Sequence, residues 1–436
     1  MLRLEEIYTK HQWYAQGIMG TPVLLSSSAL SGFILEREGL EMEFSHFLFR
    51  YANDQAEMLY DTADLERLWK HLRERILSDA NFLEEIKHRY DTNFNSFRTL
   101  FAETRSGDIT SFDDTRLLDV LKKSVTAQCD SVGLGHIIEP ISIVGSDEVR
   151  ERIVREGGKR ADLNRIIVDL FEPDEISFLT KEENELCGIA ALSKKEQEAA
   201  LQDHLERYFW LENTYASTNT LTLTSLGERM EQLAKEHKKP PQQTSAADKE
   251  QMMRDMHLSE ETKRLIHALN FCTLWQDERK TKILRSLSSL DMVLKEVGRR
   301  TNIDHTSVRY LGPYEIGKLQ GISEISALAD TLKQRRHGCY YYMTKNNEYF
   351  TPPQEFKEVS NVHHAQIDHG VYQELRGMIA NLGTAIGTVK VCTTLDALKD
   401  FPEGAVLVAH MTRPEYAPAM KKAAAIVTDE GGITSH

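Results

Sequence analysis

The chain has 436 residues, of which 41% are hydrophobic and 28% are charged, a balance that excludes wholesale disorder and suffices for two or three folded domains. Its formal net charge of −14 opposes nonspecific binding to nucleic acid or to an anionic membrane, so we expect neither as a partner. A local basic pocket for a phosphorylated small molecule is still compatible with this charge.

The cysteines and the N-terminus bear on the cellular compartment. The five cysteines are far apart and none belongs to a Cys-x-x-Cys pair, so the sequence suggests neither a disulfide framework nor a structural zinc site. The first residues form no apolar signal segment, and no stretch approaches the roughly 18–20 apolar residues of a membrane span. The sequence therefore predicts a cytoplasmic protein.

Most of the first 337 residues have the apolar spacing of amphipathic helices. Between Asp64 and Thr104, apolar side chains recur every three or four residues, the period of one buried helical face. The same spacing recurs at about 115–129, 147–171, 181–210, 252–279, 283–300 and 323–336. A polar, proline-bearing stretch at 238–250 predicts a loop. We therefore expect a helical region over 1–237 and a second helical block over 251–337.

The sequence changes character after Gly338. β-Forming residues on both sides of an Asn-rich turn predict a hairpin at 338–353, and the polar residues after it predict a hinge linker at 354–372. From 373 to 436 the chain is strand-like and punctuated by glycine, which is typical of an α/β domain. The predicted fold class is therefore a mainly α-helical N-terminal region followed by a small α/β domain.

Two groups of side chains outside the C-terminal domain are candidates for binding. Aromatic rings and polar tips that suit a ligand pocket occur together at Tyr208, Trp210, Asn213 and Tyr215. The core of a helical region is the commoner explanation for such residues, and both interpretations stay open. Four residues close enough in sequence to ligate a metal are His363, His364, Asp368 and His369. A polar hinge is the commoner explanation here, and we assign no metal site.

The chain ends on an apolar run, a glycine-rich turn and a histidine, with TDEGGITSH from Thr428 to His436. The run Ala423–Val427 predicts a buried strand. A neutral imidazole is a competent nucleophile near pH 7, and histidine carries phosphoryl groups as a covalent intermediate. The neighbours of His436 suit this role in three ways. The glycines Gly431 and Gly432 admit a phosphate, and the hydroxyls of Thr434 and Ser435 can donate hydrogen bonds to it. Acidic support would come from Asp429 and Glu430. A histidine without a role is the alternative, and the residues alone leave both open.

Residues 374–436 also resemble the swivelling phosphohistidine domain of phosphoenolpyruvate-utilising enzymes, a family that includes phosphoenolpyruvate synthase, pyruvate phosphate dikinase and rifampicin phosphotransferase. The motifs that carry the resemblance are Gly-x-x-Ala-x-x-Gly-x-x-x-Gly at 377–387, Gly-x-Val-Leu-Val at 404–408, Met-Thr-x-Pro at 411–414 and the closing TDEGGITSH. In that family the histidine of the closing motif is phosphorylated, which here is His436.

The sequence departs from the family pattern in places. It has His410 where a proline is usual and Asn381-Leu382 where Ser-Pro or Cys-Pro is usual. The helix and strands that follow the histidine in the family are not found, nor are an ATP-grasp domain or a phosphoenolpyruvate-binding barrel. The resemblance therefore implies an incomplete, truncated phosphohistidine domain at 373–436, or a gene that continues past His436.

The resemblance implies a carrier that swings between a nucleotide site and an acceptor site, with the 354–372 linker as its hinge. ATP and Mg²⁺ are expected on a partner chain, an ATP-grasp protein that acts in trans. In rifampicin phosphotransferase a mostly helical acceptor-binding domain precedes the phosphohistidine domain. By that likeness, the helical region of this chain would hold a small-molecule acceptor.

Two functions from different classes follow. The first is a component of a dikinase-type phosphotransferase that carries a phosphoryl group on His436 from an ATP-grasp site to the acceptor. The alternative is a non-catalytic helical binding or scaffold protein with a vestigial phosphohistidine domain. An acid-labile phosphate on His436 distinguishes the first from the second.

Overall fold

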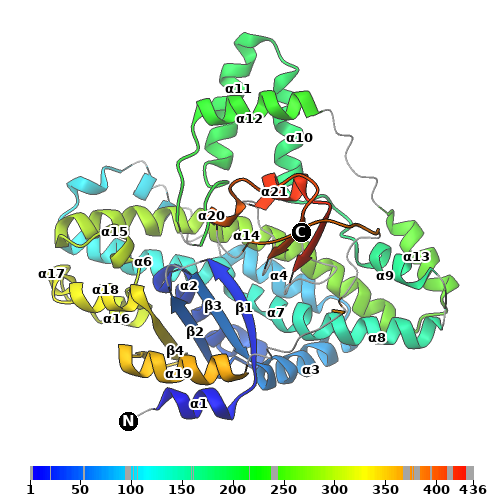
Figure 1. Ribbon diagram of the computed structural model, residues 1–436, viewed down its shortest axis with the longest axis horizontal. Helices are drawn as coiled ribbons and strands as arrows, with labels where there is room; N and C mark the ends of the chain where they lie inside the picture. The colour runs from blue at the N-terminus through cyan, green and yellow to red at the C-terminus, as the bar shows by residue number, and fades with distance from the viewer. Residues whose placement is uncertain are drawn as a thin grey trace.

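The computed structural model describes the chain except for residues 1–2, 20, 53–54, 94–99, 102, 106, 159, 161, 216, 237–243, 367–373, 376, 378–382, 393–394, 410–415 and 429–436. The described part is mainly helical, with a five-stranded sheet and a three-stranded sheet near the C-terminus (Figure 1). None of its described helices is both long and apolar enough to span a membrane.

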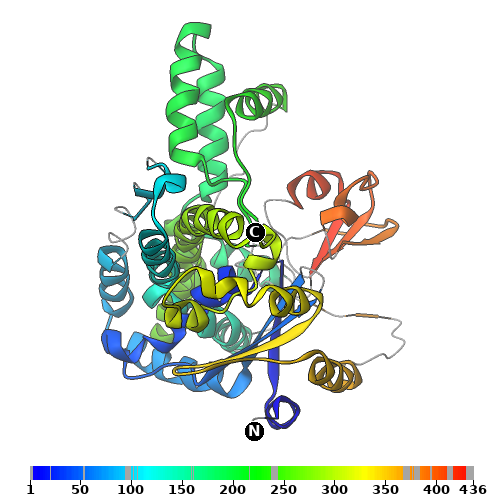
Figure 2. The same ribbon diagram turned by 90° about the vertical axis from the view of Figure 1, so that its left-hand side faces the viewer.

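The described strands lie toward the two ends of the chain, and the described elements between them are helices. Up to residue 208 they are α1 (Leu4–Lys10), β1 (Trp13–Met19), α2 (Pro22–Ala29), β2 (His46–Ala52), β3 (Gln55–Asp61), α3 (Thr62–Ser78), α4 (Phe82–Asn93), α6 (Asp114–Val132), α7 (Ile138–Pro140), α8 (Ser146–Gly157), α9 (Leu163–Phe171), α10 (Phe178–Ala190) and α11 (Lys194–Tyr208). The later ones are α12 (Leu223–Glu236), α13 (Ala246–Asp255), α14 (Glu260–Thr301), α15 (His305–Val308), α16 (Pro313–Lys318), α17 (Ser323–Ser326), α18 (Ala329–His337), β4 (Cys339–Thr344), β5 (Glu348–Phe350), α19 (Pro353–Gln366), β6 (Val389–Val391), α20 (Leu395–Leu398), β7 (Val406–Ala409), α21 (Ala417–Lys422) and β8 (Ala425–Thr428). Helices α10, α11 and α12 project from the body as an arm (Figures 1 and 2).

The five-stranded sheet is antiparallel and has the order β1-β3-β2-β4-β5. Its central strands come from distant parts of the chain, since Tyr51 on β2 is paired with Cys339 on β4. The pair β4–β5 lies where the sequence predicts a hairpin, and it completes a sheet that begins at residue 13. The sheet therefore ties residues 338–353 to the N-terminal segment.

Both faces of this sheet are packed. Alternate residues such as Phe47 and Phe49 point into the main core, which the sheet shares with the helices of the body. Residues on the opposite face, such as Leu48 and Leu59, pack under α1 and α19, which lie side by side along the sheet (Figure 1). Each helix supplies a buried apolar stripe to that smaller core.

Helix α14 is the longest described helix, with 42 residues, and it supplies core side chains from Leu265 to Val297. The Ser259 side chain accepts a hydrogen bond from the Thr262 amide at its start. Helix α14 is capped at its end by Asn302. This residue has a left-handed backbone conformation, and its amide donates a hydrogen bond to the Gly298 carbonyl. The sequence predicted separate helices at 252–279 and 283–300. Because no proline or glycine interrupts residues 280–283, the two predicted helices are continuous from Glu260 to Thr301, while residues 252–255 belong to α13.

The predicted helical region over 1–237 also contains three strands, β1, β2 and β3, which were not predicted from the sequence. Strand β2 reads HFLFRYA and has buried residues on both faces. A strand buried on both faces has no clear alternation, so its periodicity does not distinguish it from a buried helix. The mainly helical character of the N-terminal region holds for the rest of its described residues.

Two predicted connections are partly helical. Residues 246–250 of the predicted 238–250 loop belong to α13, which Ser245 caps by accepting a hydrogen bond from the Asp248 amide. Residues 354–366 of the predicted 354–372 linker belong to α19, because Phe356, Val359 and Val362 give that segment an apolar stripe that packs on the sheet. Residues 244–245 are described and not helical, whereas 238–243 and 367–372 lie outside the described residues.

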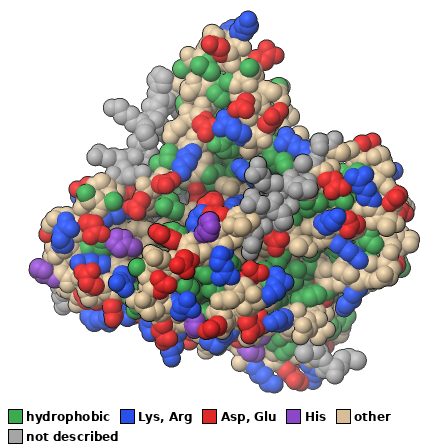
Figure 3. Space-filling model, turned by 180° about the vertical axis from the view of Figure 1, so that it is seen from behind, with side chains coloured by type: hydrophobic (Ala, Val, Ile, Leu, Met, Phe, Trp, Pro, Cys, Tyr) green, Lys and Arg blue, Asp and Glu red, His purple; other side chains and the backbone are tan. Residues whose placement is uncertain are grey.

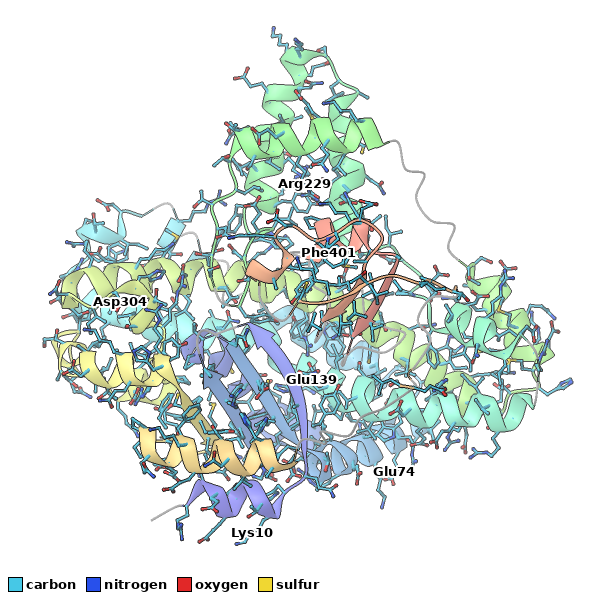
Figure 4. The ribbon with its side chains drawn as sticks, viewed as in Figure 1. Lys10, Glu74, Glu139, Arg229, Asp304 and Phe401 are labelled. Atoms are coloured by element: carbon cyan, nitrogen blue, oxygen red, sulfur yellow. The ribbon has the colours of Figure 1, made fainter. Side chains whose placement is uncertain are left out.

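The C-terminal unit is a parallel sheet of order β6-β7-β8, with α20 and α21 beside it. Its small core contains Cys392, Phe401, Ala405, Leu407, Ala409, Tyr416 and Ala419. Phe401 is labelled in Figure 4, and Figure 2 shows the unit, in orange and red, standing beside the helical body.

Candidate functional site

The candidate site belongs to the carboxyl edge of the three-stranded sheet. Val391, Val408 and Val427 lie side by side in the parallel register, so all three strands end at the same edge. The segment 429–436 follows directly from Thr428, the last residue of β8. Open α/β sheets bind ligands beyond the carboxyl ends of their strands. The closing motif therefore begins at the edge where such a site is expected.

The predicted phosphate-carrying residues themselves lie outside the described residues. They are Asp429, Glu430, Gly431, Gly432, Thr434, Ser435 and His436. Their roles therefore stay predictions. The structure describes the sheet that precedes this segment.

Hydrogen bonds around a buried tyrosine hold this framework together. The Cys392 amide donates to the Val408 carbonyl at 2.7 Å, which continues the β6–β7 pairing beyond the last strand residue. The Tyr416 hydroxyl, in a side chain only 4% exposed, donates to the Cys392 carbonyl at 2.9 Å. Burial raises the pKa of the Cys392 thiol, so it stays protonated and acts as a core residue. The carboxyl end of β6 is therefore fixed to the helix side of the sheet.

The structure explains why two positions in the motifs at 377–387 and 404–408 are glycine. A Cβ on Gly387 would collide with the carbonyl oxygen of Gly404, so only glycine allows this close approach of the two segments. Gly404 has φ 74°, a left-handed conformation that disfavours other residues. The approach places the start of β6 beside the start of β7, where the Val406 amide donates to the Thr388 carbonyl at 2.9 Å.

Strand β8 is present as predicted, but its residues are not fully buried. Ile426 is 40% exposed and Val427 is 51% exposed. The core of the unit lies on the face of Leu407, toward α20 and α21. The expectation of a buried strand at 423–427 is thus wrong within the described chain: Val427 lies on the open face, while Ile426 shares the face of Leu407 and is exposed because β8 is at the edge of the described sheet.

The first two residues of the predicted acceptor pocket are engaged in packing and hydrogen bonds. The Tyr208 hydroxyl donates to Glu185 Oε1 at 3.0 Å, and burial together with that bond raises the pKa of Tyr208 to about 12. Trp210 is 1% exposed, and its indole donates to the Arg207 carbonyl at 2.9 Å. Both rings belong to, or pack against, the main core.

The other two residues are placed similarly. The Asn213 side-chain amide donates to the Leu284 carbonyl at 2.9 Å and to Ser288 Oγ at 2.6 Å on α14. Its oxygen accepts from the Asn219 amide at 3.1 Å. Tyr215 is partly buried against the main core. Asn213 therefore fastens the loop after α11 to the long helix, and the arrangement is the one that the core interpretation describes.

A pocket of about 220 Å³ lies elsewhere in the body. Its lining residues are Ile34, Glu38, Tyr90, Asp130, Gly133 and Leu134. Two of them are acidic, which disfavours an anionic ligand such as a phosphate ester. The predicted acceptor residues are not among them, so the pocket gives that prediction no support.

The histidines that were weighed as metal ligands join two helices. His363 and His364 lie on α19, whereas Asp368 and His369 lie outside the described residues. His363 Nδ1 is 2.7 Å from the Tyr8 hydroxyl on α1, and burial lowers the pKa of His363. The pair connects the two helices that cover one face of the five-stranded sheet.

Three polar residues that the sequence did not single out meet at one end of that sheet. His11, His46 and Asp61 place one ligating atom each within 4.8 Å of one another. They are up to 50 positions apart and form no local motif, so their spacing gives no signal. Only the strand pairing brings them together.

Comparisons with known proteins concern the C-terminal unit. The family model "PEP-utilising enzyme, mobile domain" matches residues 401–436. A probable phosphoenolpyruvate synthase of Methanocaldococcus jannaschii is 52% identical over 60 residues, which are 14% of this chain and 5% of that protein. The phosphoenolpyruvate synthases of Aeropyrum pernix and Pyrococcus furiosus are 52% identical over 63 residues and 50% identical over 62, in each case 14% of this chain and 8% of the relative.

The matched segment is therefore less than a tenth of the length of these relatives. It includes β7, α21, β8 and the closing motif, which are the parts that frame the carboxyl edge. The expected resemblance is confirmed for this segment: the C-terminal unit of the chain is similar to the mobile domain of phosphoenolpyruvate-utilising enzymes.

Proposed function

We propose that this protein is a phosphotransferase component that carries a phosphoryl group on His436. The observation that supports this most is the similarity of residues 401–436 to the mobile domain of phosphoenolpyruvate-utilising enzymes, with the closing motif included. The position of that motif, directly after the last strand of a parallel sheet, is where a phosphate-binding loop is expected.

The chemistry follows from the residue types of the motif. A neutral imidazole nitrogen of His436 attacks a phosphorus atom of ATP, a nitrogen–phosphorus bond forms and the bond to the nucleotide oxygen breaks. The nucleotide leaves with the negative charge, which Mg²⁺ bound at the ATP site would neutralise. In the second step an acceptor oxygen attacks the same phosphorus, and the imidazole leaves neutral. Two positioned displacements replace one encounter of three partners.

The neighbours of His436 would serve both displacements. Gly431 and Gly432 give a bulky phosphate access to the ring, because neither has a side chain. The hydroxyls of Thr434 and Ser435 can donate hydrogen bonds to phosphate oxygens. Asp429 and Glu430 would orient the loop or assist Mg²⁺ when the domain is docked at the nucleotide site. That site is proposed on an ATP-grasp protein in trans.

The non-catalytic alternative also has an observation in its favour. Trp210 and Asn213 are used in packing and hydrogen bonds rather than presented to a ligand. If the helical region holds no phosphoryl acceptor, the protein would instead be a non-catalytic binding or scaffold protein with a vestigial phosphohistidine domain. The two functions differ in whether His436 ever holds a phosphate.

The decisive experiment measures that phosphate directly. The gene product would be incubated with Mg-ATP and an ATP-grasp protein, and its intact mass recorded before and after acid and alkali. We expect one added phosphoryl group that is labile in acid and stable in alkali, absent from His436→Ala and present in His364→Ala. The latter is a matched control, because His364 is an exposed histidine on α19.

Absence of the phosphate would count against the proposal only if the partner is active and the C-terminal unit is folded. ATP turnover by the ATP-grasp protein and hydrogen-exchange protection of β7 and β8 establish these two conditions. If both hold and His436 remains unmodified, the non-catalytic function is the better account.

A further inference from the structure

The cluster of His11, His46 and Asp61 is built by the pairing of the first three strands. Asp61, the last residue of β3, pairs with Trp13 on β1. On its other side the β2–β3 register, continued from Leu48 and Leu59, places His46 opposite Asp61. His11 lies two residues before Trp13, and in an extended chain the side chains of two such residues point to the same face. All three side chains thus belong to one end of the face that α1 and α19 cover.

A backbone hydrogen bond holds the first histidine in place. The Thr62 amide, next to Asp61, donates to the Gln12 carbonyl, next to His11, at 2.9 Å. This bond fastens the connection between α1 and β1 to the end of β3. Lys10, labelled in Figure 4, marks the end of α1 at this connection.

The ligating atoms converge on one carboxylate oxygen. His11 Nδ1 is 2.7 Å from Asp61 Oδ2, and His46 Nε2 is 3.4 Å from the same oxygen. Zinc–nitrogen and zinc–oxygen bonds of about 2.0–2.2 Å place tetrahedral ligand atoms about 3.3 Å apart. The His46 contact already has this spacing, and the His11 contact would open by roughly half an ångström.

The second histidine points into the cluster without a hydrogen-bond partner. His46 is 7% exposed, and its Nε2 atom contacts Asp61 Oδ2 at 3.4 Å without the geometry of a hydrogen bond. Burying an imidazole nitrogen in this way is unfavourable unless something binds it. A ligand at Nε2, beside the carboxylate, would satisfy this atom.

Hydrogen bonds around the cluster hold the Asp61 side chain and the backbone beside His46. Asp61 Oδ1 accepts from the Ala63 amide at the start of α3, which leaves Oδ2 directed at the histidines. The backbone amide of Ser45, next to His46, donates to the buried carboxylate of Asp64 at 2.6 Å. Outer contacts of this kind orient metal ligands and determine their affinity.

The cluster is closed by aromatic rings on one side and open on another. The rings of Trp13 and Tyr342 lie 5.4 Å and 5.6 Å from the His46 ring, between centroids. The His11 side chain is 32% exposed, so solvent reaches the cluster from its side. That opening gives an ion a path of entry and room for a water ligand.

We propose that His11, His46 and Asp61 bind a divalent transition metal ion of the zinc class, with water in a fourth position. Two imidazoles and one carboxylate are the donors that Zn²⁺ prefers, whereas Mg²⁺ and Ca²⁺ favour oxygen ligands alone. The ion joins the α1–β1 connection, the start of β2 and the end of β3. This metal site is separate from the Mg²⁺ proposed for phosphoryl transfer and independent of that function.

The test compares zinc affinity among matched variants. The chain, freed of metal by a chelator, would be titrated with Zn²⁺ against a chromophoric competitor. Asp61→Asn keeps the oxygen that caps α3 and removes the charge, while His11→Gln changes a partly exposed residue. We expect each to weaken zinc binding roughly 100-fold or more, since loss of even an outer partner costs 10–100-fold. The control His88→Gln, at an exposed position on α4, should bind zinc as the parent does.

A spectroscopic readout separates a metal site from a loss of stability. Co²⁺ in place of Zn²⁺ should give the parent and His88→Gln the visible absorption of a four-coordinate site, which Asp61→Asn and His11→Gln lose. Metal-free melting curves of the variants show whether the fold is retained. Equal zinc affinity in the parent and His11→Gln, or a parent that binds Mg²⁺ as tightly as Zn²⁺, would overturn the proposal.

Discussion

The two sheets of this protein differ in how they are covered. In the five-stranded sheet Leu48 and Phe49 point to opposite faces, and both side chains are fully buried. In the three-stranded sheet Leu407 is fully buried on one face, whereas Val389 and Val391 on the other are 60% and 58% exposed. The first sheet lies between two helical layers, whereas the second has, among the described residues, helices packed on one side only.

This difference matters because parallel sheets are normally buried on both faces. An apolar surface that stays in contact with water adds little to stability, so the C-terminal unit relies on the small core around Leu407 and Tyr416. The body instead shares one continuous core among its sheet and helices. We therefore expect the two regions to unfold separately, with the C-terminal unit the less stable one.

The surface of the body is mixed in charge. Acidic and basic side chains alternate across the face seen in Figure 3. Such a surface keeps the body well solvated. Stability differences between the two regions are therefore best tested at buried positions.

The largest effect is expected at a buried ion pair in the body. Arg279 donates to Glu139 Oε1 and to the Gly135 carbonyl, both at 2.6 Å, and Glu139 is labelled at the centre of Figure 4. Arg279→Ala would leave a carboxylate buried without its partner and lower the free energy of unfolding of the body by about 3–5 kcal/mol. Denaturant unfolding measures this.

A double variant serves as the control for that prediction. Arg279→Met with Glu139→Leu removes both charges and keeps apolar volume, so it should recover most of the lost stability. If the double variant is as unstable as Arg279→Ala, packing around the guanidinium and not the unpaired charge is responsible.

A pair of matched leucine substitutions tests whether the two regions unfold separately. Leu407→Ala should cost about 2–5 kcal/mol, enough to unfold the C-terminal unit while the body stays folded. Hydrogen exchange would then show β6–β8 unprotected and α14 still protected. Leu290→Ala removes an equally buried leucine from α14 and should destabilise the body without first exposing β6–β8. Loss of protection in both regions with either variant would mean that they unfold together.

Acid should destabilise the body through Asp291. Burial alone would raise the pKa of this carboxyl, but the hydrogen bond from His305 and the charge of Arg309 outweigh it and hold the pKa well below its usual range. Because the pKa is lower in the folded state, the contribution of Asp291 is present above the unfolded pKa of about 4 and is lost as pH falls below it.

The measurement is the free energy of unfolding between about pH 6 and pH 2. It should fall with acidification in the parent, and the slope should be smaller in Asp291→Asn, which cannot release a proton. Since His305 and Arg309 also lie in the body, protection of β6–β8 should be unaffected by this substitution. A slope unchanged in Asp291→Asn would assign the acid sensitivity to other carboxylates.

The sequence allowed much of the helical part and little of the first sheet to be predicted. Amphipathic periodicity identifies α3 and α14 because each has a polar face. Strand β2 is not predicted, because nearly all of its residues are buried and it therefore lacks the alternation of apolar and polar residues that identifies a strand. The register that joins β2 to β4 links residues about 300 apart, and no local pattern encodes such a pairing.

The candidate sites divide in the same way. The C-terminal unit was recognisable because its motifs are local, and the reasons for Gly387 and Gly404 are equally local. The roles of Trp210 and Asn213 were not decided by residue type, since an aromatic ring or an amide suits a core as well as a pocket. The cluster around Asp61 depends on strand pairing and so has no signature in the sequence.

The smallest effect, and the one that sharpens the comparison of the two sheets, is expected at a pair of valines, one in the smaller sheet and one on a helix that covers the larger sheet. Val427 on β8 is 51% exposed, whereas Val359 on α19 is fully buried against the five-stranded sheet. Val359→Thr buries a hydroxyl and should cost about 1–3 kcal/mol. Val427→Thr should change the stability of the C-terminal unit by less than about 0.5 kcal/mol, because its side chain is already in contact with water.

The outcome at Val427 also tests what the open face does in solution. Parallel sheets are rarely left uncovered, and an open row of valines favours association. If Val427→Thr destabilises the C-terminal unit as much as Val359→Thr destabilises the body, the face must be covered in solution by another segment or another molecule. Sedimentation of the two variants then separates these cases, since only contact between molecules changes the mass with concentration.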